Sequence, residues 1–196
     1  MSAKIIRLNA PARLPVVVLF AETRGFTRTS AILEPAVVLA QAAAFFDMAC
    51  KAVERNSGSV HSVLNDTLMA TFAGDGRARQ AVQAARDIQR DFGRIEDAWS
   101  RDFGIRAAVA MGLHEGDAVL GEQGGMPMVV GDSISVATRL LHRARAGEFV
   151  LSSSVMAALG GDAAGLDAQT LPPLEITRRD PIPLHGVVLD TRLDFT

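Results

Sequence analysis

The sequence has a single cysteine among its 196 residues, so an internal disulfide is excluded. Cys50 stands in an apolar helical stretch, where we expect a buried, unreactive thiol. A chain of this length can bury a sufficient core without disulfides or a structural metal. With 48% apolar and 21% charged residues, the composition is typical of a globular protein. The sequence therefore predicts a fold stabilised by its hydrophobic core.

The sequence also lacks an excess of positive charge and a long apolar run near its start. The net charge is -2 and the pI is about 6.1, so no basic field neutralises phosphates and we expect no nucleic-acid partner. The first fifteen residues do not resemble a signal peptide, and the β-like apolar run at residues 16–21 is far too short to span a bilayer. We expect a cytoplasmic protein with no membrane partner. Without repeats or low-complexity tracts, residues 1–14 are predicted to be an extension and residues 15–196 one domain.

The apolar pattern along the chain predicts alternating strands and helices. A continuous β-branched run ends at Glu22, and two short strands flank Asn65 and Asp66 as a hairpin. Apolar residues three and four positions apart predict amphipathic helices. The expected strands cover residues 15–21, 59–64, 67–72, 105–113, 118–121 and 148–152, and the expected helices cover residues 35–55, 77–99 and 132–141. The order βαββαβ fits a ferredoxin-like α+β sheet, with both crossover helices on one face and a C-terminal extension.

Polar and glycine-rich segments are expected to separate these elements. Residues 23–27 and 114–117 are predicted to be turns, and Gly124 with Gly125 a flexible excursion. Short strands are expected near residues 174–177 and 187–195 in the tail.

Two acidic residues fall at corresponding ends of neighbouring strands. Glu22 leaves the first strand, and Asp66 lies at the turn before the third. The first and third strands of a ferredoxin-like sheet are adjacent, so both side chains are expected at one edge. Two carboxylates can bind Mg²⁺, which usually keeps waters and substrate phosphates in its shell. Two such ions can activate an attacking hydroxyl and neutralise a departing pyrophosphate. Spacing alone leaves open the alternative that both acids are solvated loop residues.

Six sequence blocks, spread over roughly residues 15 to 195, resemble the class III adenylate/guanylate cyclase catalytic domain. The first block resembles the family pattern L-F-A-D-[IV]-x-G-F-T, and the second resembles F-I-G-D-x-x-M-A-x-F. The blocks are LFAETRGFT at 19–27, VLNDTLMATF at 63–72, GLHEG with VLG at 112–121, VGDSISVATRL at 130–140, AGEFVLS at 146–152 and LHGV at 184–187. One block would be weak, but six in the family's order are highly specific.

The resemblance implies a head-to-tail homodimer with nucleoside triphosphate sites at the subunit interface. One protomer would supply metal carboxylates, at Glu22 and Asp66, for Mg²⁺ or Mn²⁺. Its partner would supply the base-reading and transition-state groups. The implied reaction is attack of the ribose 3′-hydroxyl on the α-phosphorus, with release of pyrophosphate. Glu22 departs from the family's aspartate by one methylene, which weakens a site for an ion that demands ligands at about 2.0–2.1 Å.

The resemblance also implies that the base-reading pair is replaced. The family's purine-reading lysine falls at Ser62, and its acidic or polar partner falls at Met128. A hydroxyl and a thioether cannot reproduce a lysine–carboxylate pair directed at a purine edge. Losing such readout costs discrimination of about 1–3 kcal/mol per pair, by analogy with DNA readout. The base is therefore either read differently or not read.

The transition-state asparagine and arginine of the family fall at Ser135 and Arg139. These residues are four apart and share a helix face. Arg139 retains a forked donor for phosphate, with a surface ion pair as the alternative. The shorter Ser135 lacks the amide donor, and losing one such donor costs about 10²–10³ in rate. Gly25, Phe26 and Thr27 would shape the triphosphate turn through their backbone.

Two functions therefore remain open. The first is a cyclase with weak activity or altered base specificity. The second is a degenerate cyclase acting as a regulatory module, for example by heterodimerising with an intact cyclase domain and lending it the metal carboxylates. His114 is expected to be structural, and His61, His142 and His185 have no metal-ligand spacing.

Overall fold

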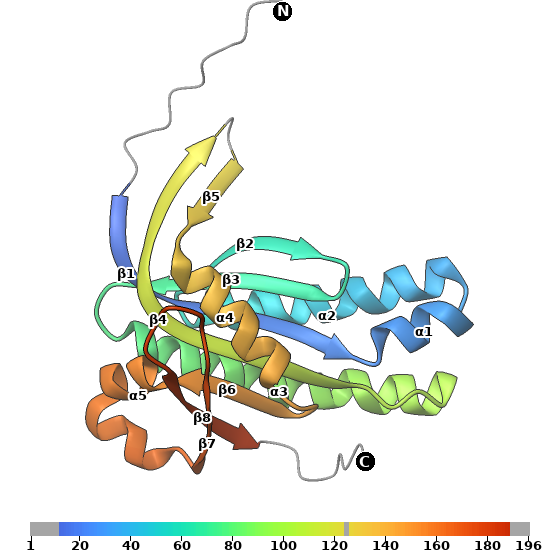
Figure 1. The fold of residues 1–196 in the computed structure, drawn as a ribbon. Coiled ribbons are helices and arrows are strands. Elements are labelled where there is room, and N and C mark those ends of the chain that lie inside the picture. Colours follow the sequence, from blue (N-terminus) through green and yellow to red (C-terminus); the bar gives the residue numbers. More distant parts are fainter. Residues whose placement is uncertain (1–11, 124–125, 189–196) are drawn as a thin grey trace, which may run out of the picture.

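An eight-stranded sheet forms the centre of the computed structural model of the chain, which describes residues 12–123 and 126–188. The strand order is β2-β3-β1-β4-β6-β8-β7, and β5 pairs with β4 (Figure 1). The strands are β1 (Ala12–Arg24), β2 (Ser59–Leu64), β3 (Thr67–Ala73), β4 (Ala108–Gln123), β5 (Met126–Val130), β6 (Glu148–Ser152), β7 (Ala168–Leu174) and β8 (Ile182–Val188). The first four strands have the ferredoxin-like order, with β1 between β3 and β4, as predicted.

Five α-helices and one 3₁₀ helix are present in the described residues. They are α1 (Phe26–Ile32), α2 (Pro35–Arg55), α3 (Arg77–Phe103), α4 (Asp132–Arg143), α5 (Ser153–Leu159) and the 3₁₀ helix η1 (Gly160–Gly165). The predicted helices at 35–55, 77–99 and 132–141 are therefore confirmed, with α3 and α4 slightly longer than expected.

Side chains alternate between the two faces of β1 and divide the core into two layers. Val17 and Leu19 belong to the cluster that packs against α2 and α3, where the Phe45 and Phe92 rings meet edge to face at 6.1 Å. Val16 and Val18 pack with Ala137 of α4. The two crossover helices thus cover one face, as predicted, and α4 lies on the other.

Helix α4 lies unusually close to the sheet at Gly112. A Cβ atom at this position would lie 2.2 Å from the backbone nitrogen of Leu141 and 2.5 Å from the carbonyl oxygen of Ala137. Only glycine permits this approach, because side chains elsewhere keep helix and sheet backbones apart.

The turn predicted at residues 114–117 is wrong, because β4 runs through it without interruption. Strand β1 pairs with β4 continuously from Ala12 opposite Leu120 to Arg24 opposite Ala108. The polar residues that indicated a turn have partners on neighbouring elements. Glu115 accepts a hydrogen bond from Arg77 at 2.8 Å, and the His114 ring lies 2.8 Å from the Ser152 hydroxyl. Tertiary contacts therefore override the local turn signal.

Other boundaries differ from the sequence-based expectations. The turn expected at residues 23–27 is reduced to Gly25, because β1 continues to Arg24 and α1 begins at Phe26. The tail strands are β7 and β8, which begin at residues 168 and 182 rather than 174 and 187. The excursion expected at residues 124 and 125, and the end of the last expected strand, lie outside the described residues. Helices α1 and α5 and strand β5 were not predicted.

Helix α2 is the one described helix that is long and apolar enough, by length and composition, to cross a membrane. Within this fold 33% of its most apolar segment is buried, and Phe45, Ala49 and Val53 contribute to the core shared with α3. Core helices of globular proteins have the same composition, so length and composition do not assign α2 to a membrane.

Candidate functional site

The two acidic residues of the sequence analysis lie side by side at one edge of the sheet. Glu22, near the end of β1, pairs in register with Thr67 at the start of β3, and the Thr23 amide donates to the Asp66 carbonyl at 3.2 Å. The Thr67 hydroxyl oxygen is 3.4 Å from Glu22 Oε2 and 3.5 Å from Asp66 Oδ1. The β2–β3 turn is sharp because Asn65 has a φ of 56°, which asparagine tolerates.

This pair of carboxylates has the donor chemistry of a magnesium site. Mg²⁺ is usually bound through one or two carboxylates together with waters and substrate phosphates. No group of three or more His, Cys, Asp or Glu side chains able to hold a metal was found among the described residues. The two acids therefore fit an ion that takes the rest of its shell from substrate and water. Their role as metal ligands stays a prediction.

Arg24 ties Glu22 to a distant helix. Its guanidinium forms an ion pair with the Glu22 carboxylate and also donates to the carbonyl oxygens of Leu141 at 2.8 Å and Ala144 at 3.2 Å. The two side chains are only 29% and 18% exposed. Glu22 is therefore not a solvated loop acid. Arg24 was not predicted as a site residue, although residues two apart on a strand share a face and Arg24 follows Glu22 at that spacing.

The turn after β1 places Gly25, Phe26 and Thr27 directly beside the carboxylates along the chain. Gly25 has a φ of 97°, and a Cβ there would lie 3.3 Å from the carbonyl oxygen of Arg106. The Thr29 amide and hydroxyl both donate to the Gly25 carbonyl at 3.0 Å, which closes the first turn of α1. Phe26 and Thr27 are the first two residues of that helix.

The two predicted base-reading positions lie on strands that contact each other. Ser62 is exposed on β2, Met128 is 39% exposed on β5, and β2 packs against β5. They offer a ligand one hydroxyl and one thioether.

The two predicted transition-state residues lie on the exposed side of α4. The buried side of this helix is formed by Val136, Ala137, Leu140 and Leu141. Among the described residues no hydrogen bond or salt bridge is recorded for the Arg139 guanidinium, but its charge acts on nearby Asp132 and contributes to lowering the pKa of that carboxyl. Its acidic neighbour Asp132 is bound instead by Arg179, with Nη2 donating to Oδ1 at 2.7 Å, and these bonds lower the pKa of Asp132.

The structure does not join the two halves of the predicted site within one chain. Among the described residues, no hydrogen bond or ion pair connects Ser135 or Arg139 with Glu22 or Asp66. The carboxylates lie at the sheet edge, whereas both α4 residues project into solvent.

The cysteine and two of the histidines have the surroundings of structural groups. Cys50 is only partly buried, not fully buried as expected, and burial, reinforced by Glu54 and Asp47, raises the pKa of its thiol, which favours the protonated form. Burial lowers the pKa of His114 to about 4, so its ring is neutral at pH 7 and pairs with Ser152. His61 lies 2.7 Å from the Thr71 hydroxyl, and burial lowers its pKa as well.

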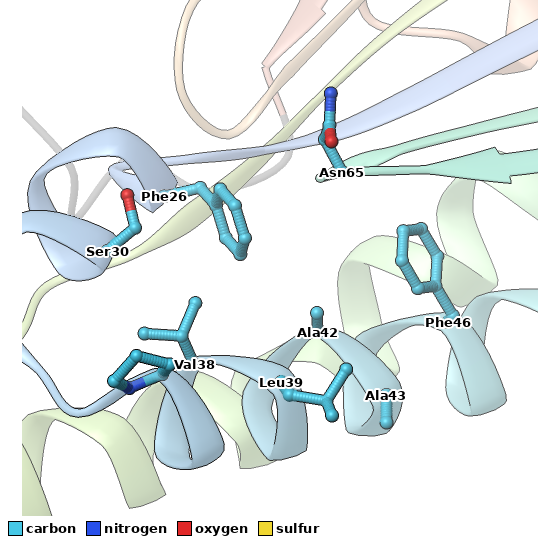
Figure 2. A pocket seen from close by; sticks show the side chains of 9 residues that line it. Phe26, Ser30, Val38, Leu39, Ala42, Ala43, Phe46 and Asn65 are labelled. Atoms are coloured by element: carbon cyan, nitrogen blue, oxygen red, sulfur yellow. The ribbon is translucent and has the colours of Figure 1, made fainter.

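An apolar cavity of about 520 Å³ is lined by residues from α1, α2 and the β2–β3 turn (Figure 2). Phe26 and Asn65 line it, and they neighbour Gly25 and Asp66 in the chain. Val38, Ala42 and Phe46 of α2 form its floor in Figure 2. Ala42 is partly exposed and lines this cavity.

Comparison with known sequences finds one informative relative. The chain is 28% identical over 143 residues to an adenylate cyclase from Anabaena cylindrica. The match covers 69% of this chain and 28% of that relative, so this chain spans well under half of the relative's length. No family model matches the sequence.

Comparison with solved structures finds close agreement in fold. The adenylyl cyclase CyaB from P. aeruginosa superposes with a TM-score of 0.83 at 19% identity, covering 96% of this chain and 100% of that chain. The guanylyl cyclase Cya2 gives 0.80 at 20% identity, covering 94% and 97%. The guanylate cyclase domain of RhGC from Catenaria anguillulae, solved with GTP, gives 0.78 at 19% identity, covering 91% and 98%. These matches confirm the resemblance in fold.

Proposed function

We propose that this chain, which has the fold of the adenylyl and guanylyl cyclase catalytic domains, converts a nucleoside triphosphate into a 3′,5′-cyclic nucleotide and pyrophosphate. The observation that carries the proposal is the meeting of Glu22 and Asp66 beside the Thr67 hydroxyl, at the sheet edge next to the Gly25 turn. We place this activity in residues 15–196 and in the cytoplasm. The named activities of CyaB, Cya2 and the Anabaena relative support it by analogy of fold.

In this proposal the carboxylates of Glu22 and Asp66 hold two divalent ions, Mg²⁺ or Mn²⁺. When bound, such ions activate the ribose 3′-hydroxyl and neutralise the departing pyrophosphate. The backbone of Gly25, Phe26 and Thr27 lines the triphosphate. The 3′-oxygen forms a bond to the α-phosphorus as the bond from that phosphorus to pyrophosphate breaks. The proton of the hydroxyl is lost to solvent.

A head-to-tail homodimer would complete the site. Ser135 and Arg139 are exposed on α4, and among the described residues no hydrogen bond or ion pair joins them to the carboxylates of their own chain, which is the arrangement expected if they serve the partner's nucleotide. The Arg139 guanidinium, with five donors in a planar fork, would stabilise the phosphate charge. Ser135 offers a shorter hydroxyl donor, so we expect a low rate.

The base specificity would differ from that of a purine-reading cyclase. Ser62 and Met128 replace a polar pair, and a thioether neither donates nor strongly accepts a hydrogen bond. We therefore expect weak discrimination between bases.

The exposure of Ser62 and Met128 favours a second candidate function. A chain with intact carboxylates but no polar base reader could act in a heterodimer, where another cyclase domain supplies the base-reading groups to its metal site. It would then be a regulatory module of cyclic-nucleotide signalling.

The decisive experiment incubates the purified chain with each of the four nucleoside triphosphates and Mn²⁺, and measures cyclic product by mass spectrometry. Product that disappears in Asp66→Ala, but not in Asp75→Ala, supports the enzyme. Asp75 is a matched control because it is an exposed aspartate in the loop after β3. Product formed only after mixing with an intact cyclase domain supports the heterodimer. If no cyclic product forms either with the chain alone or after mixing with an intact cyclase domain, both the enzyme and the heterodimer hypotheses are contradicted.

A further inference from the structure

Arg24 occupies the space beside Glu22 and has three partners at once. One of its nitrogens forms the ion pair with Glu22, and another donates to the Leu141 and Ala144 carbonyls. The ion pair is half-buried, so water screens it less than an exposed pair. A cation of this chain therefore already neutralises one of the two carboxylates proposed to bind metal.

The two carbonyl acceptors belong to the C-terminal end of α4. Leu141 is in the last turn of this helix, and Ala144 is its C-cap residue. The same helix carries Ser135 and Arg139, which would serve the other nucleotide site of a dimer. Arg24 is thus a direct mechanical connection between Glu22 and the helix that presents the proposed transition-state residues.

We propose that Arg24 is a positioning residue that competes with the divalent cation for Glu22 and couples occupancy of the metal site to the C-terminal end of α4. This inference rests on the proposed metal role of Glu22 and Asp66. Without metal, the guanidinium holds Glu22 in place and neutralises it. When a divalent ion binds, repulsion between the two positive charges displaces the guanidinium from Glu22. The carbonyls of Leu141 and Ala144 keep it attached to α4, so its movement shifts that helix end.

The first test measures binding of Mn²⁺ alone to the full chain by electron paramagnetic resonance, without nucleotide. Arg24→Gln removes the competing charge, and we expect it to bind Mn²⁺ about tenfold more tightly than the wild type. Arg77→Gln is a matched control. Arg77 forms a similar half-buried ion pair, but with Glu115 on β4. Glu115 lies opposite Val17, which is five residues before Glu22 on β1, so this pair is separate from the carboxylates proposed to bind metal. This control should leave the Mn²⁺ affinity unchanged.

A double-mutant cycle then identifies the group for which Arg24 competes. In a Glu22→Gln background, Arg24→Gln should change the Mn²⁺ affinity by less than about threefold, because the Glu22 carboxylate for which Arg24 and Mn²⁺ compete is absent. An equal tenfold effect in both backgrounds would overturn competition for Glu22 and indicate only a general charge effect.

The conservative variant Arg24→Lys tests the connection to α4. An ammonium keeps the charge but cannot bridge Glu22 and two carbonyls as the planar fork does. We expect wild-type Mn²⁺ affinity within about threefold. In the wild type, Mn²⁺ should change amide hydrogen exchange at residues 140–144, and in Arg24→Lys this response should be lost. No response in the wild type overturns the coupling.

The outcomes separate this inference from the proposed function. If Arg24→Gln binds Mn²⁺ no more tightly than the wild type, the inference fails, while the cyclase assay can still succeed. If neither the wild type nor Arg24→Gln binds Mn²⁺, Glu22 and Asp66 do not form a metal site, and both the proposed cyclase function and the proposed role of Arg24 are wrong. Should Arg24→Gln not fold, as judged by circular dichroism, the hydrogen-exchange comparison of wild type and Arg24→Lys decides the inference.

Discussion

The carboxylate edge (Glu22, Arg24, Asp66 and Thr67) and the exposed site residues (Ser62, Met128, Ser135 and Arg139) differ in how the chain holds them. The edge is tied internally, because Thr67 lies between the acids and Arg24 binds both Glu22 and α4. The exposed residues project into solvent. The difference teaches that one half of the proposed site is held together within a chain, whereas the other half is exposed, as the proposed homodimer requires.

Arg139→Ala is expected to have the largest effect on the exposed half. Losing a phosphate donor should lower the rate of cyclic-nucleotide formation by about 10²–10³, while thermal stability stays unchanged because Arg139 is exposed. Arg143→Ala, one turn further along α4 and also exposed, is the control and should retain full activity. If mixing Arg139→Ala with Asp66→Ala chains restores no activity, the two halves do not come from different protomers.

The double substitution Ser62→Lys with Met128→Asp should restore polar base reading. A regained pair contributes about 1–3 kcal/mol of discrimination, so preference for one purine triphosphate should rise about 5- to 150-fold. The ratio of kcat/KM values for GTP and ATP measures this effect. An unchanged ratio would mean that β2 and β5 do not read the base. Ser62→Thr is the control, since it adds no charge.

Gly112→Ala tests the close contact between Gly112 of β4 and the backbone of α4, the helix on which Ser135 and Arg139 lie. The added Cβ would meet the backbone of α4 at 2.2 Å, so the helix must move, and we expect a loss of about 1–3 kcal/mol in the free energy of unfolding. Chemical denaturation measures it. Gly93→Ala in α3 is the contrasting control, because its Cβ meets nothing within 4 Å and alanine favours a helix. Equal effects would show that α4 is not held closely at Gly112.

The smallest effect concerns His114, which faces Asp132 at the start of α4. Its pKa is about 4 in the folded chain, below the ordinary value of 6.5, because burial disfavours the charged ring. The unfolded chain therefore binds the extra proton between these values, and stability falls as the pH drops from about 6.5 towards 4. As the pH is lowered across this range, the denaturation midpoint of His114→Gln should fall less steeply than that of the wild type. If the denaturation midpoints of the two proteins change with pH in parallel, the lowered pKa of His114 does not contribute to the pH dependence of stability.

Local patterns in the chain were sufficient for most of the elements. Apolar spacing predicted α2 and α3, because the buried stripe of a helix repeats with the helical period. The β2–β3 hairpin followed from Asn65 and Asp66 between two short strands. The convergence of Glu22 and Asp66 followed in turn from the adjacency of the first and third strands. By contrast, the stretch at residues 114–117 was misread because its polar residues are paired by distant elements.

What the sequence by itself determined is the ferredoxin-like order of strands and helices and the pair of acids at one sheet edge, because both arise from short-range periodicity and strand adjacency. Only the tertiary structure decided that β4 continues through its polar segment, that α4 lies against Gly112 and that Arg24 joins Glu22 to α4. Arg24 and Leu141 are 117 positions apart, and no local pattern encodes a contact between them. Such contacts exist only once the sheet has brought the end of β1 beneath the helix.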